Sequence, residues 1–116
     1  MRRDPRVCLW DIQQAAEAIS KFVAGIDVET YSASELIHSA VERKFEIIGE
    51  ALGQLTKLDP GLARRIPDGR DIIAFRNVLI HGYAAVEHQR VFHIAQTSLS
   101  SLRAAVDALL TELGAS

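Results

Sequence analysis

Three side chains suited to phosphodiester chemistry lie within one short, otherwise apolar stretch of the chain. Residues 76–83 read RNVLIHGY and contain Arg76, His81 and Tyr83. Arginine is permanently cationic and can hold a phosphate through two parallel hydrogen bonds, whereas histidine is the side chain best suited to move a proton near neutral pH. Arg76 and His81 together therefore indicate a site that acts on a phosphodiester.

The spacing of these residues predicts how a helix presents them. On an ideal helix Arg76 and His81 lie about 140° apart, whereas Asn77 lies about 40° from His81 and one turn before it. The three side chains form an arc that also contains Ile80. Such a mixed face is expected where two subunits meet around a cleft, and we expect Asn77 to orient the imidazole of His81.

The helix that carries this arc is predicted over residues 71–80, with Gly82 suited to end it. Its apolar residues are distributed nearly all round the helix: Ile72, Ile73, Phe75, Val78, Leu79 and Ile80. A helix this apolar must be covered on more than one side. Because a bundle covers one of its faces, we predict that a second copy of the chain covers another, in a homodimer.

The remaining sequence supplies the elements that position this helix. Asp4 before Pro5 predicts the start of a first helix that ends near residue 25. Ser32, with Glu35 three positions later, is a plausible capping box for a second, long helix that runs to about residue 58. Apolar residues recur at helical spacing through both segments, so each should bury one broad face.

Turn signals and periodicity predict the rest of the fold. Residues 26–31 show no helical period, residues 62–66 can form one or two helical turns, and residues 87–113 read as one long last helix. Gly49, inside the second helix, is expected to permit a close approach of another helix. The predicted fold is all-α: an up-and-down bundle of four main helices plus a short extra helix, in a single domain over residues 1–116.

Composition limits the class of protein. The 116 residues are 48% hydrophobic and 24% charged, with a net charge of −2. The broad positive field of a protein that holds long nucleic acid is absent, so any RNA contact must be local.

Cys8 is the single cysteine and cannot form an internal disulfide. No signal peptide or membrane span is evident, so the expected location is the cytoplasm.

Two segments together carry a family resemblance. Residues 40–51 (AVERKFEIIGEA) and residues 72–83 (IIAFRNVLIHGY) resemble the second helix and the R-x4-H-x-Y motif of the HepT-like ribonucleases, in the HEPN superfamily. The similarity covers most of the chain, from Asp4 to Leu113. It implies a HEPN-like bundle that acts as a homodimer in which the motifs of two subunits face each other.

The resemblance also implies an activity, which is metal-independent endonucleolytic cleavage of RNA by the adjacent 2′-OH. DNA lacks this hydroxyl. Arg76 and His81 would be the catalytic residues: His81 would move a proton and Arg76 would stabilise the developing charge on the phosphate. No cofactor is implied.

The resemblance further implies a control mechanism at Tyr83. By default this tyrosine is an interface or core aromatic residue. In HepT-like toxins of type VII toxin–antitoxin systems, the matching tyrosine receives AMP from a MntA-type nucleotidyltransferase antitoxin. The added phosphate charge and nucleoside would repel and block RNA. Tyr83 is therefore the predicted site of AMPylation, and the chain the predicted toxin.

Acidic and histidine residues elsewhere allow two interpretations. Glu42, Glu46 and Glu50 lie four residues apart on one stripe of the second helix, which is most often a solvated face. Alternatively, Glu46 or Glu50 approaches Arg76 or His81 and supports the site. His38, His88 and His93 lie on separate elements or five residues apart, a spacing that does not suggest a metal site, so no bound metal is predicted.

A non-enzymatic function stays open. The dimer could instead be a nucleotide-binding or scaffolding partner of a minimal nucleotidyltransferase, in which Arg76 grips phosphate and His81 is structural. A DNA-binding regulator is disfavoured by the acidic charge balance.

Overall fold

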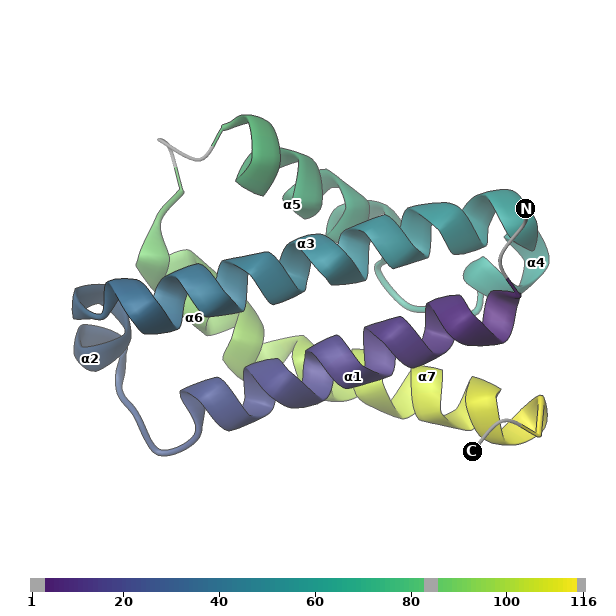
Figure 1. Cartoon of the computed structure of the whole chain (residues 1–116), viewed down its shortest axis with the longest axis horizontal. Helices are drawn as coiled ribbons and strands as arrows, with labels where there is room; N and C mark the ends of the chain where they lie inside the picture. Colours follow the sequence, from purple (N-terminus) through teal and green to yellow (C-terminus); the bar gives the residue numbers. More distant parts are fainter. Residues whose placement is uncertain (1–3, 83–85, 115–116) are drawn as a thin grey trace.

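The chain folds into a bundle of helices joined by short turns (Figure 1). The computed structural model describes residues 4–82 and 86–114. Its helices are α1 (Pro5–Val23), α2 (Val28–Ala33), α3 (Glu35–Leu58), α4 (Pro60–Ala63), α5 (Gly69–His81), α6 (His88–Thr97) and α7 (Leu99–Glu112). No strand occurs in the described ranges, so the all-α prediction is confirmed.

The core lies between α1, α3 and α7, which run alongside one another (Figure 1). α1 packs against α3 on one side and against α7 on the other, and α5 lies on the outer side of α3. Burial of a large aliphatic side chain contributes about 1.5–3 kcal/mol. The largest fully buried side chains are Leu9, Ile12, Ile19, Tyr31, Ile48, Leu52, Leu55 and Leu110.

Side-chain caps fix where the first helices begin. Asp4 Oδ1 accepts a hydrogen bond from the Arg6 backbone N–H at 2.8 Å, as expected for an N-cap. α3, however, is capped by Ser34, whose hydroxyl oxygen accepts from the Ile37 N–H at 3.2 Å. The prediction of a start at Ser32 is therefore wrong by two residues.

The segment predicted to be irregular contains a helix. α2 begins after Asp27, whose Oδ1 accepts from the Thr30 N–H at 2.8 Å. Six residues are too few to show a helical period, so the sequence pattern did not reveal it. Tyr31 anchors α2 because its side chain is fully buried.

The predicted last helix is broken at Ser98 into α6 and α7. Hydroxyl side chains near the break bond to backbone carbonyl oxygens: Thr97 Oγ1 donates to His93 O at 2.9 Å, and Ser101 Oγ donates to Ser98 O at 3.1 Å. Such bonds compete with the regular helical ladder and bend helices. None of the helices in the described part of the chain is both long and apolar enough to cross a membrane.

Candidate active site on helix α5

Arg76 is held at the junction of α5 and α3. Its side chain is partly buried, and its Nη1 donates a hydrogen bond to Asn77 Oδ1 at 3.0 Å. Its Nε is buried and has no partner among the described residues. An unmet buried donor is unfavourable, so an anion that supplies acceptor oxygens at this position would relieve that penalty.

Gly49 of α3 creates the space in which Arg76 lies. A Cβ placed at Gly49 would overlap the Cβ of Arg76, lie 2.7 Å from its Cγ and lie 3.4 Å from the backbone oxygen of Ile72. The two helices therefore approach each other at a point where no larger residue fits. This confirms the close approach expected at Gly49 and gives the stem of Arg76 a rigid backing.

His81 is the last residue of α5, and its side chain is exposed. The Gly82 N–H completes the final turn by donating to Val78 O at 2.8 Å, and the helix ends because the backbone of Gly82 leaves the helical conformation. Val78 is 49% exposed and Ile80 is 36% exposed. Polar and apolar side chains thus share the outer face of α5, as the predicted arc requires.

The predicted supporting residues lie in different surroundings. Asn77 bonds to Arg76, and its proposed action on His81 stays a prediction. Glu46 lies 3.5 Å from Arg43 Nη1 on its own helix, whereas the side chain of Glu50 is exposed. In residues 4–82 and 86–114 no hydrogen bond or ion pair joins either glutamate to Arg76 or His81, which favours the solvated-face interpretation of both.

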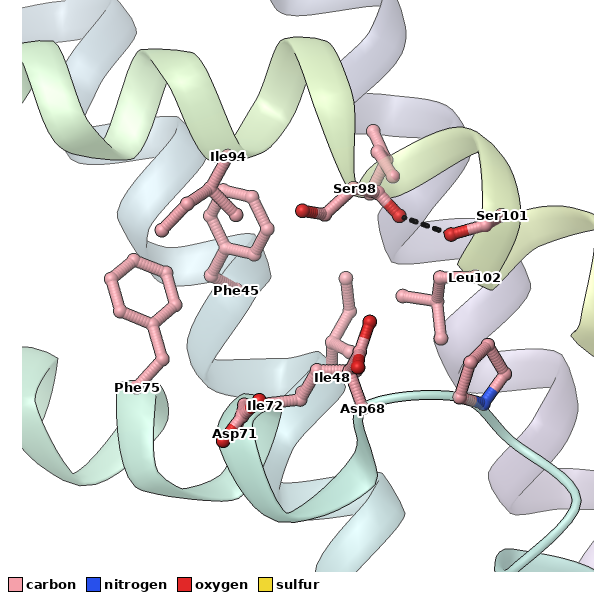
Figure 2. A pocket seen from close by; sticks show the side chains of 12 residues that line it. Phe45, Ile48, Asp68, Asp71, Ile72, Phe75, Ile94, Ser98, Ser101 and Leu102 are labelled. Atoms are coloured by element: carbon pink, nitrogen blue, oxygen red, sulfur yellow. Dashed lines mark hydrogen bonds between the residues drawn. The ribbon is translucent and has the colours of Figure 1, made fainter.

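Two hollows border α5 on the side that faces α6 and α7. Figure 2 shows the first, into which Phe75 and Ile72 of α5, Phe45 and Ile48 of α3 and Ile94 of α6 project. The rings of Phe45 and Phe75 pack edge to face, and their centroids are 5.3 Å apart. The second hollow lies between α5 and the start of α6 and includes Val78 and Arg90. Neither is lined by Arg76 or His81, so neither hollow is a pocket for the two candidate catalytic side chains.

Tyr83 lies outside the described residues, so the predicted modification site has no structural description.

The structure does reveal a group of polar side chains that the sequence pattern missed. His38 and Glu42 of α3 meet His88 at the start of α6, and the two imidazole rings stack with centroids 3.9 Å apart. Their separation along the chain is large, and they meet because the start of α6 packs against α2, which itself packs against α3.

Known proteins resemble this chain over most of its length. The profile of the family described as "Ribonuclease HepT-like" matches residues 12–109. A protein of Thermococcus cleftensis named "Probable ribonuclease HepT" is 31% identical over 103 residues, which cover 89% of this chain and 93% of the relative. A protein of Methanocaldococcus jannaschii named "Putative RNase" is 26% identical over 106 residues, which cover 91% of this chain and 96% of the relative. No solved structure gives a significant match.

The matched residues extend from α1 into α7 and include both sides of the close approach between Gly49 and Arg76. The all-α bundle agrees with the fold that the two sequence segments imply. The chain belongs to the HepT-like ribonuclease family.

Proposed function

We propose that the protein is a metal-independent RNA endonuclease that acts through Arg76 and His81 at the interface of a homodimer, as the toxin of a cytoplasmic type VII toxin–antitoxin system. The observation that carries the proposal is the placement of Arg76. Gly49 and Asn77 fix its position, and its buried Nε has no partner in the described part of the chain. Membership of a ribonuclease family and the exposed imidazole on the same helix support the assignment.

The proposed reaction is an internal transfer of the phosphate. The 2′-oxygen of a ribose forms a bond to the adjacent phosphorus, and the bond from phosphorus to the 5′-oxygen breaks. His81 accepts the 2′-OH proton or, in protonated form, donates a proton to the leaving oxygen, with the solvent completing the proton balance. Arg76 donates hydrogen bonds to the non-bridging oxygens as their negative charge increases.

The products test this mechanism. We expect fragments that end in a 2′,3′-cyclic phosphate, or the 3′-phosphate from its hydrolysis, opposite a free 5′-OH. A substrate with a 2′-deoxyribose at the cleavage position should not be cleaved. EDTA should leave the rate of RNA cleavage unchanged. Mass spectrometry of the fragments tests the mechanism, because 3′-OH and 5′-phosphate ends would contradict it.

A homodimer is expected through α5, whose outer face exposes Val78 and Ile80 beside the candidate catalytic residues. A stable pair typically buries about 1,200–2,000 Å² in total. Val78→Asp places a charge on this face and should convert the dimer to a monomer in analytical ultracentrifugation. Val7→Asp is a matched control on α1, because Val7 is 43% exposed. Dissociation by Val7→Asp alone would place the interface on α1 and contradict the proposal.

Control by covalent modification is proposed at Tyr83, two residues beyond His81. A MntA-type nucleotidyltransferase should transfer AMP from ATP to the hydroxyl oxygen of Tyr83, with release of pyrophosphate and of the phenolic proton. The modification should abolish RNA cleavage while the dimer stays folded, because the added phosphate repels RNA. Tyr83→Phe keeps the ring but lacks the acceptor oxygen, so it should escape silencing. Intact-mass analysis after incubation would contradict the assignment if the phenylalanine variant were labelled as fully as the wild type.

The surroundings of His81 favour one alternative. The described residues provide no carboxylate that orients its imidazole, whereas Arg76 is well fixed. The dimer could therefore be a nucleotide-binding or scaffolding partner of a nucleotidyltransferase that grips phosphate without cleaving it. In that case Arg76→Ala would weaken binding of the partner or nucleotide, and His81→Ala would change nothing.

A further inference from the structure

Three polar side chains converge where α2, α3 and the start of α6 meet. Glu42 Oε2 lies 3.5 Å from Nδ1 of His38 and 3.7 Å from Nδ1 of His88. One ligand atom from each of the three residues lies within 4.8 Å of the other two. His38 and Glu42 are one turn apart on α3, and His88 is the first residue of α6.

These separations are too long for hydrogen bonds. The usual N–H···O distance is about 2.7–3.2 Å, and both Nδ1 atoms are buried without a hydrogen-bond partner in the described ranges. Both nitrogens lie within ion-pair distance of the same carboxylate oxygen but form no hydrogen bond with it. Packing alone does not explain why two histidines are held in this arrangement, because an unmet buried polar atom is unfavourable.

The same separations suit ligands of one metal ion. With Zn–N and Zn–O bonds of about 2.0–2.2 Å, the ligand atoms of a tetrahedral site lie about 3.3 Å apart. The observed 3.5 and 3.7 Å are within a few tenths of an ångström of this value. A nitrogen lone pair lies in the plane of its ring, and the two rings stack with 20° between their planes, so binding requires one imidazole to rotate out of the stack. An ion between the three groups would then bond to both nitrogens and would join α3 to α6.

The walls of the cluster favour a cation and limit access to it. Tyr31 of α2 lies beside both imidazoles, with ring centroids 6.2 and 6.4 Å away, and its buried hydroxyl has no partner among the described residues. The site therefore offers two imidazoles, one carboxylate and one hydroxyl.

We propose that His38, Glu42 and His88 bind one divalent transition-metal ion of the zinc class, with a water molecule in the fourth position. Two imidazoles and one carboxylate are ligands that suit Zn²⁺ and Co²⁺, whereas Mg²⁺ and Ca²⁺ require oxygen ligands. The ion is structural, because it fastens the start of α6 to α3 and includes neither Arg76 nor His81. The proposal is independent of RNA cleavage.

Metal titration of the full-length protein tests this site. After removal of metal with EDTA and dialysis, Zn²⁺ should bind at one ion per chain in calorimetry and raise the melting temperature. Co²⁺ should bind in the same place and give the visible absorption of a four-coordinate ion. Mg²⁺ at the same concentration should cause neither change.

Matched variants assign the ligands. His88→Gln and Glu42→Gln should each weaken Zn²⁺ binding at least tenfold and abolish the Co²⁺ spectrum, while circular dichroism confirms that the metal-free proteins are folded. His93→Gln, at an exposed histidine on the same helix as His88, should bind as the wild type does. Equal affinity of wild type and His88→Gln, or no saturable binding by the wild type, would overturn the proposal. Because His81 is unchanged in these variants, loss of the metal with retained RNA cleavage would leave the proposed catalytic site standing.

Discussion

His81→Ala should reduce RNA cleavage by about 10²–10⁴-fold, because it removes the group that transfers the proton. Expression of the wild type without an antitoxin should arrest growth and degrade cellular RNA, whereas the variant should be folded and harmless. The side chain of His81 is exposed at the end of α5, so its truncation should leave the bundle intact. Growth curves, RNA integrity and circular dichroism of the same preparations measure these effects.

Two further variants sharpen this test. His93→Ala removes another exposed histidine and should stay toxic, which separates catalysis from general loss of an imidazole. Arg76→Ala should be as inactive as His81→Ala, and Arg76→Lys should not restore full activity because an ammonium lacks the planar fork of a guanidinium. Equal toxicity of the wild type and His81→Ala would refute the enzymatic function and favour the scaffolding alternative.

Gly53→Ala should stabilise the protein and Gly49→Ala should not, although both glycines lie on α3 one turn apart. Replacing a helical glycine by alanine gains about 1 kcal/mol from helix propensity. At Gly53 nothing lies within 4 Å of an added Cβ, so the free energy of unfolding should rise by about that amount. At Gly49 the Cβ would overlap Arg76, and such overpacking costs about 1–3 kcal/mol, so the gain should be cancelled or reversed.

The same pair of variants should differ in activity. The added methyl at Gly49 must displace the stem of Arg76, and a displacement of about 1 Å can lower the rate of an enzyme about 10²-fold. Gly53→Ala should cleave RNA at the wild-type rate. Urea unfolding and cleavage rates of both variants measure the two effects. A Gly49→Ala protein as stable and as active as Gly53→Ala would show that the close approach of α3 and α5 does not position the arginine.

Sequence periodicity predicted the long elements and the helix that carries the candidate site. The pattern was sufficient there because apolar residues repeat over several turns and because Gly49 and Gly82 mark a contact and an end. It failed where the determining feature is local. Ser32 and Ser34 have the same capping chemistry, and the choice between them depends on α2, which is too short to show a period.

Tertiary packing determines what the pattern could not show. The helix break at Ser98 depends on which side-chain hydroxyls donate hydrogen bonds to backbone carbonyl oxygens of the preceding turn. The convergence of His38 and His88 depends on the packing of α6 against α2 near the start of α3, and no spacing in the sequence encodes that packing. The hydrogen bond from Arg76 to Asn77 likewise depends on side-chain conformations that the spacing of the two residues does not encode.

α5 rests on α3 and packs extensively against no other helix in the described part of the chain. Elements with few buried contacts open at a small fraction of the global unfolding free energy and exchange their amide hydrogens readily. A single chain would therefore keep its arginine and histidine on a segment that opens often, and pairing with a second copy would close it. Cleavage should then rise with the square of protein concentration below the dissociation constant, so a cell would tolerate a few copies and be arrested by a modest increase.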